Sequence, residues 1–175
     1  MKNVKRLVLA AVFAALACVA TLIITFTLPG GGYFNLGDCI VITAGCLLGP
    51  VYGAAAAGIG TALADLLSGF PAYAPATLLI KAAMAVVAWL LFSKLKKRIP
   101  KAGLLAAVVA SVSAEVIMIA GYFVFECFLY GMEIAVIDIA GNALQGGAGI
   151  ITGSLLVWLF TKNKTLHSFF YEQDR

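Results

Sequence analysis

The sequence predicts an all-α integral membrane protein, a single domain of six transmembrane helices with both termini in the cytoplasm. Three observations predict it: 63% of the 175 residues are hydrophobic, only 11% are charged, and the mean hydropathy is +1.05. A soluble domain normally carries about 25% charged residues. Because each span needs about 20 apolar residues, six spans leave only short loops, and no separate soluble domain fits.

Glycine and proline separate the predicted spans. The first ends at Pro29 and a run of glycines, Gly49 and Pro50 close the second, and Pro75 opens the fourth, a position where proline is tolerated. The second span is short for a full crossing, so we expect it to be tilted or shielded by its neighbours. The predicted spans cover residues 6–28, 38–49, 51–67, 75–93, 103–130 and 137–160.

Basic residues are confined to one side of this predicted topology. Eleven of the twelve Lys and Arg residues fall within residues 2–6, 94–101 and 162–175, whereas the intervening loops on the other side contain none. The positive-inside rule therefore places these clusters, and both termini, in the cytoplasm. No basic run is interleaved with aromatic residues, so nothing in the sequence indicates nucleic-acid binding.

Polar side chains within the spans are few, and in membranes such groups are costly and usually functional. Glu115, Tyr122 and Glu126 fall within about 40° of one another on one helix face. Asn142 and Gln145 lie one turn apart in the outer half of the last span. We expect these groups to converge on a pocket that opens to the outside and holds a small, flat, polar heterocycle.

The alternative for these groups is a network that satisfies only itself. Lys81 lies in the outer half of the fourth span and Asp65 near the outer end of the third. In that case Lys81 would pair with Asp65 or Glu126, and Asn142 would bond to neighbouring backbone.

The loop after the first span is a candidate lid over the pocket. Its glycine run supplies conformations that other residues rarely adopt, and polar and aromatic side chains follow directly. Lids of this kind close over bound ligands. The candidate substrate-binding residues are Tyr33, Asn35, Asp38, Lys81, Glu115, Tyr122, Glu126, Asn142 and Gln145.

No catalytic, metal or cofactor motif is expected. The sequence contains no HExxH, GxSxG or Walker A motif, and its four cysteines form no CxxC pair, as a zinc site would require. Glu115 and Glu126 would lie about 16 Å apart along one helix, too far to act as an acid/base pair. We expect the cysteines to pack as apolar side chains, the alternative being a disulfide between Cys39 and Cys127.

Small residues at helical spacing mark the first span. Ala10 and Ala14, and Ala11 and Ala15, form two overlapping pairs four residues apart, a spacing that lets helix backbones approach closely. Packing within the chain and docking onto a partner membrane protein both remain open for these pairs.

Several stretches resemble the substrate-binding S components of energy-coupling factor (ECF) vitamin transporters. They are GGYFNLGD at 31–38, LGPVYG at 48–53, ALADL at 62–66, and YAPAT at 73–77 followed by Lys81. The resemblance is strongest to the branch that handles pyridoxine, hydroxymethylpyrimidine or related heterocycles, and riboflavin is a further candidate.

The resemblance implies a non-enzymatic subunit in the plasma membrane of a prokaryote. It would bind a small vitamin-like ligand from outside, gated by the loop after the first helix. It would dock through Ala10, Ala11, Ala14 and Ala15 onto a transmembrane coupling protein joined to two ATPase subunits. The alternative is a self-contained membrane channel or facilitator for a small polar solute.

Overall fold

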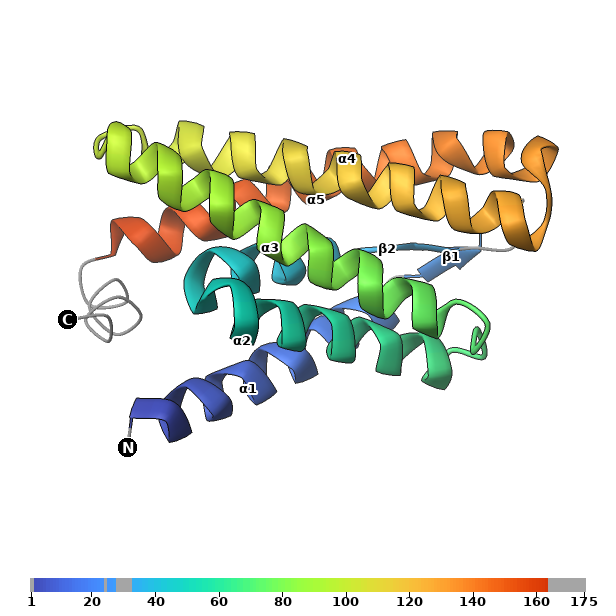
Figure 1. Cartoon of the computed structure of the whole chain (residues 1–175), viewed down its shortest axis with the longest axis horizontal. Coiled ribbons are helices and arrows are strands. Elements are labelled where there is room, and N and C mark those ends of the chain that lie inside the picture. Colours follow the sequence, from blue (N-terminus) through green and yellow to red (C-terminus); the bar gives the residue numbers. More distant parts are fainter. Residues whose placement is uncertain (1, 24, 28–32, 164–175) are drawn as a thin grey trace.

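The described residues, 2–23, 25–27 and 33–163, form five long helices and one small β-hairpin in a computed structural model. Each of these helices is long and apolar enough to cross a membrane, so the chain is a multi-pass membrane protein. The elements are α1 (Lys2–Ile23), β1 (Thr25–Thr27), β2 (Tyr33–Asn35), α2 (Asp38–Leu67), α3 (Ala74–Arg98), α4 (Gly103–Leu129) and α5 (Met132–Lys162) (Figure 1).

Helix α2 folds back on itself at Gly49. This residue has φ 84° and ψ −179°, outside the helical region, and Pro50 follows it. A Cβ placed on Gly53 would lie 2.7 Å from the carbonyl oxygen of Ala44, although a straight helix would hold these residues about 13 Å apart. The two arms of α2 therefore pack against each other, and Figure 1 shows the chain reversing at this point.

The short first arm of α2 corrects the prediction of six spanning helices. The predicted spans 38–49 and 51–67 are the two helical arms on either side of the Gly49 kink and together form α2, so the structure has five helices of spanning length within the described residues. The first arm rises only about 16 Å at 1.5 Å per residue, roughly half of the hydrocarbon thickness of about 30 Å. It lies inside the bundle, where residues 41–47 are all buried.

A β-hairpin replaces the last turn of the first predicted span. Helix α1 ends at Ile23 rather than at residue 28, and β1 then pairs antiparallel with β2, with Phe26 opposite Phe34. The glycine hinge predicted at 30–32 lies outside the described residues.

Glycines bring the helices into close contact. A Cβ on Gly60 would overlap the carbonyl oxygen of Ala14, and one on Gly58 would lie 2.6 Å from the carbonyl oxygen of Leu78. Helix α2 thus packs closely on both α1 and α3. In a membrane such contacts replace the hydrophobic drive that lipid does not supply.

The ends of the bundle differ in charge. The start of α1, the connection from α3 to α4 and the end of α5 lie at one end, and the β-hairpin lies toward the other (Figure 1). Of the described basic residues, all but Lys81 belong to the segments at the first end. The arrangement agrees with the predicted two-sided charge distribution, and the cytoplasmic location of the basic end stays a prediction from the positive-inside rule.

Candidate functional site

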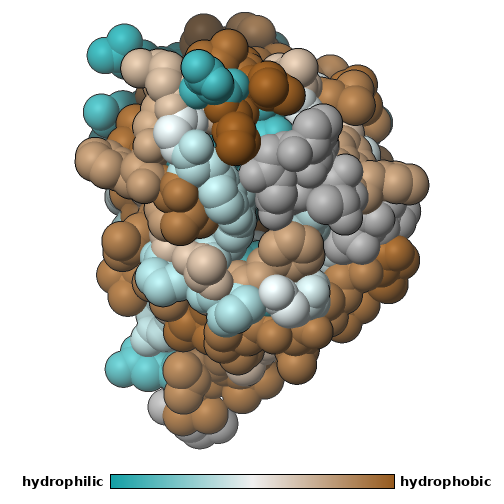
Figure 2. All heavy atoms as spheres, turned by 90° about the vertical axis from the view of Figure 1, so that its right-hand side faces the viewer, coloured by the Kyte–Doolittle hydropathy of each residue, from teal (hydrophilic) through white to brown (hydrophobic). Residues whose placement is uncertain are grey.

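A polar cavity lies at the hairpin end of the bundle. The free space inside it is about 20 Å³, room for about one water molecule, so a vitamin-sized ligand fits only after the lining side chains or the hairpin move. Figure 2 looks onto this end and shows a band of hydrophilic residues on a mostly hydrophobic surface. The lining residues are Thr21, Tyr33, Asn35, Thr61, Asp65, Tyr73, Thr77, Lys81, Tyr122, Glu126, Asn142 and Gln145.

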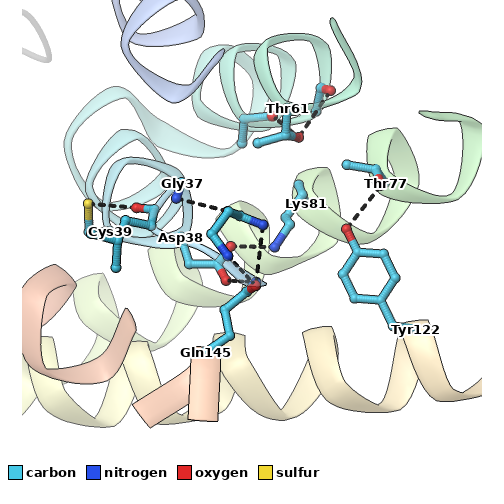
Figure 3. A network of polar contacts seen from close by, with 12 residues as sticks. Gly37, Asp38, Cys39, Thr61, Thr77, Lys81, Tyr122 and Gln145 are labelled. Atoms are coloured by element: carbon cyan, nitrogen blue, oxygen red, sulfur yellow. Dashed lines mark hydrogen bonds and ion pairs between the residues drawn. The ribbon is translucent and has the colours of Figure 1, made fainter. Parts of the chain in front are cut away.

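An ion pair and an amide bridge join the hairpin to the helices beneath it (Figure 3). Lys81 Nζ pairs with Asp38 Oδ1, and Gln145 Nε2 donates to Asp38 Oδ2 at 2.6 Å. Gln145 Oε1 in turn accepts from the backbone N–H of Asn35 at 2.9 Å and from its Nδ2 at 3.2 Å. Strand β2 is thereby tied to α5, and through Asp38 to α3.

The partner of Lys81 corrects the self-satisfied network weighed from the sequence. That network paired Lys81 with Asp65 or Glu126, whereas the structure pairs it with Asp38. Asp38 opens α2, where a carboxylate is favoured by the helix dipole, and it is fully buried at 0% exposure. It therefore acts below the hairpin and is not among the residues that line the cavity.

Tyr33 of β2 lines the cavity and ties the hairpin to α2. Its hydroxyl donates to Asp65 Oδ1, and its ring lies 4.8 Å from the ring of Phe70. Burial, and next the Asp65 carboxylate, raise the pKa of Tyr33 above its usual value, so the hydroxyl stays protonated and remains a donor. The hairpin is thus held at two points, through Tyr33 and through Asn35.

The polar stripe predicted on α4 divides in two. Tyr122 and Glu126 line the cavity, and Tyr122 shares a 3.0 Å hydrogen bond with Thr77, with its ring centroid 5.3 Å from Lys81 Nζ. Glu115 lies deeper, 1% exposed and outside the lining. Its carboxylate faces Gly149, where a Cβ would overlap it.

Several site residues escaped the sequence analysis. Thr21, Thr61, Tyr73 and Thr77 line the cavity but carry no charge that would single them out in an apolar span. Asp138, beside the cavity lining, is buried at 0% exposure; the predicted span placed it one residue from the helix start, whereas α5 begins at Met132. Asp138, Asn142 and Gln145 fall at i, i+4 and i+7 on one face, which is the signal that would have revealed it.

The cysteines and the candidate metal ligands can be compared with the predictions from the sequence. Cys18, Cys39, Cys46 and Cys127 are all free, so the alternative of a Cys39–Cys127 disulfide is wrong. Within the part of the chain that the structure describes, no three His, Cys, Asp or Glu side chains are grouped as a metal site would need.

The alanines of α1 border an apolar groove against the second arm of α2. Ala10 is buried and Ala14 half-buried, and Ala14 contacts Gly60. Ala11 and Ala15 are exposed on the groove. The two predicted roles thus separate: one pair packs within the chain, and the other faces outward.

A sequence model of the ECF-type riboflavin transporter S component family matches residues 1–162. The chain belongs to this family. It is therefore a transporter S component, the subunit that binds a vitamin or vitamin precursor, and not a member of an enzyme class.

Two curated relatives match this S component over most of its length. An uncharacterized protein of Pyrococcus woesei ("Uncharacterized protein in gap 3'region") is 33% identical over 146 residues, covering 82% of this chain and 93% of its own. The thiamine precursor transporter HmpT of Lactococcus lactis subsp. cremoris (strain MG1363) is 28% identical over 176 residues, covering 96% and 95% of the two chains.

Proposed function

We propose that this S component serves an ATP-driven ECF importer for a small water-soluble vitamin or precursor. Hydroxymethylpyrimidine and pyridoxine are the favoured ligands, and riboflavin is a further candidate. The importer would lie in the plasma membrane of a prokaryote, with the hairpin end outside. The similarity to HmpT supports a precursor-type ligand.

The observation that carries this proposal is the cavity beneath the hairpin. Its walls combine carboxylates, amides and tyrosine rings at one end of a bundle whose described basic residues, apart from Lys81, gather at the other. Aromatic faces suit a flat ring, and a few convergent polar groups fix its orientation. The bonds from Asn35 to Gln145 and from Tyr33 to Asp65 support the hairpin as the lid.

Transport would need the coupling protein and two ATPase subunits as partners. The exposed Ala11 and Ala15 offer a surface for the coupling protein, because small residues let a second helix approach closely. Ala10 and Ala14 support that surface from within by seating α1 on α2.

Ligand binding by the purified chain tests the proposal. Mass spectrometry should find a vitamin-like heterocycle that co-purifies, and calorimetry should measure its rebinding. Tyr122→Ala and Glu126→Gln should each weaken binding about 10- to 100-fold, through loss of a ring wall or a charged acceptor.

The control is Glu133→Gln in the first turn of α5, where the side chain is exposed. Its affinity should equal that of the unmodified chain. Unchanged affinity in both cavity variants would contradict the site. Solute uptake by the chain alone in vesicles, without ATP or partner subunits, would instead favour a channel or facilitator.

A further inference from the structure

The apolar groove between α1 and the second arm of α2 is much roomier than the polar cavity. Its free space is about 560 Å³, against about 20 Å³ in the cavity. Ala10 and Ala56 line it and are buried, whereas Leu7, Ile59 and Leu63 line it and are 64%, 50% and 47% exposed. The two helices lie side by side on the outside of the bundle (Figure 1), so the groove faces the surroundings of the protein.

The groove has the depth of one leaflet of a bilayer. On α1 its lining runs from Leu7 to Val19, a rise of about 18 Å at 1.5 Å per residue. The hydrocarbon core of a bilayer is about 30 Å thick, so one leaflet is about 15 Å deep. Leu7 lies in the second turn of α1, and the groove therefore extends from the basic end of the bundle to about the middle of the membrane.

The chemistry of the groove favours an acyl chain as its occupant. Its lining consists of alanine, leucine, valine and isoleucine side chains and Cys18. Water in the groove would leave this apolar surface hydrated, and an empty groove would forfeit the dispersion contacts of its walls. The alanines along α1 leave a channel that larger side chains would fill, and an acyl chain is the slender apolar group that a bilayer supplies.

The charge at the start of the groove favours an anionic head group. Lys5 and Arg6 directly precede Leu7 on α1, and long basic side chains extend toward the membrane surface while their stems stay on apolar surface. The segments that form this end of the bundle, 2–6, 94–101 and 162–163, contain no Asp or Glu. Basic segments of this kind attract anionic lipids.

We propose that the groove holds one acyl chain of an anionic phospholipid from the leaflet at the basic end, with the lipid phosphate at Lys5 and Arg6. The lipid covers Ala11 and Ala15, the surface that the proposed function offers to a coupling protein, so docking of that partner displaces the lipid. The lipid site itself depends on this chain alone and not on the vitamin-like ligand, whose cavity lies at the hairpin end.

The first test measures lipid binding to the full chain in detergent by native mass spectrometry. The probes are phosphatidylglycerol and phosphatidylcholine with the same acyl chains. The unmodified chain should retain one phosphatidylglycerol, about 5- to 25-fold more tightly than phosphatidylcholine, for one to two basic contacts. Equal retention of the two lipids would overturn the proposal, and this comparison needs no substitution that could disturb folding.

The second test locates the acyl chain by photolabelling in bilayers. A phosphatidylglycerol with a diazirine near the end of one acyl chain should label the far end of the groove, at Val19 and Ile59. Val116 of α4 and Ile151 of α5 are 58% and 63% exposed outside the groove and serve as references for ordinary lipid contact. Labelling of these references as strong as that of the groove would contradict a bound lipid.

Two pairs of variants separate the acyl chain from the head group. Ala11→Phe, which fills the groove, should lower retention of phosphatidylglycerol about 3- to 10-fold, whereas Val12→Phe, 49% exposed outside the groove, should not. Lys5→Gln with Arg6→Gln should reduce the preference for phosphatidylglycerol to near one, whereas Lys97→Gln with Arg98→Gln, at exposed positions of α3, should keep it.

The remaining outcomes decide between occupants of the groove. A dimer of the chain in native mass spectra, with the groove shielded from photolabelling, would overturn the proposal in favour of a second copy. Groove labelling that persists at full strength with a coupling protein bound would overturn the displacement step. Loss of lipid selectivity together with intact binding of a vitamin-like ligand would overturn the lipid site and leave the proposed function standing.

Discussion

Replacing Lys81 by methionine removes a buried ammonium group and keeps a side chain of similar length. Lys81 is 1% exposed, and its partner Asp38 is 0% exposed and also accepts from Gln145. Removal of one partner from a buried ion pair leaves the other charge uncompensated and costs about 3–5 kcal/mol. For a chain of this length that loss corresponds to a fall of about 6–20 °C in the midpoint of thermal unfolding.

The assay is thermal unfolding of the purified chain in one detergent, with Lys97→Met at an exposed position of α3 as the matched control. Lys97→Met should leave the midpoint nearly unchanged. The double variant Lys81→Met with Asp38→Asn should recover part of the loss, because both charges are then gone. The reasoning is refuted if Lys81→Met unfolds at the same temperature as Lys97→Met, or if the double variant is less stable than both single variants.

Two further predictions concern close packing and docking. Gly149→Ala should lower the free energy of unfolding by about 1–3 kcal/mol, because the added Cβ would overlap the Glu115 carboxylate. The control Gly147→Ala should not, because nothing lies within 4 Å of its Cβ. Equal thermal unfolding midpoints for the two variants would contradict the contact. Ala15→Trp should abolish co-purification with the coupling protein and leave ligand binding unchanged. Leu16→Trp, at an exposed position outside the groove, should keep both the co-purification and the ligand binding. Co-purification of Ala15→Trp with the coupling protein would argue against the docking surface.

The membrane architecture could be predicted because it follows from composition and spacing. Apolar runs, the placement of Lys and Arg and the breaks at Gly and Pro are properties of neighbouring residues along the chain. The polar residues of α4 and α5 could also be identified, because an ionisable or amide side chain is conspicuous in an apolar span. Tyr122, Glu126, Asn142 and Gln145 were found in this way, and the structure brings them to one cavity.

The parts that escaped prediction depend on contacts between distant segments. Gly49 and Pro50 predict a break, but whether the arm before the break spans the membrane or ends inside the bundle depends on packing against other helices, such as the close approach of Gly45 to Ala85 of α3. Likewise Lys81 had several carboxylates within plausible reach, and only the folded positions of α2 and α3 select Asp38. Asp138 was missed because an error of a few residues in a helix start changes a buried group into an apparently solvated one.

The pairing of Asp38 with Lys81 also bears on how the chain enters the membrane during synthesis. A lysine or an aspartate costs up to about 2.5–3.5 kcal/mol on insertion scales when it lies at the centre of a span, and less toward its ends. Asp38 precedes Lys81 in the chain, so its helix has left the ribosome before α3 emerges. The lysine can therefore meet its counter-ion as it inserts, and Gln145 joins the pair only when the last helix arrives. The order of the residues along the chain thus matches an order of assembly in which Lys81 and Gln145 each find Asp38 already in the bilayer.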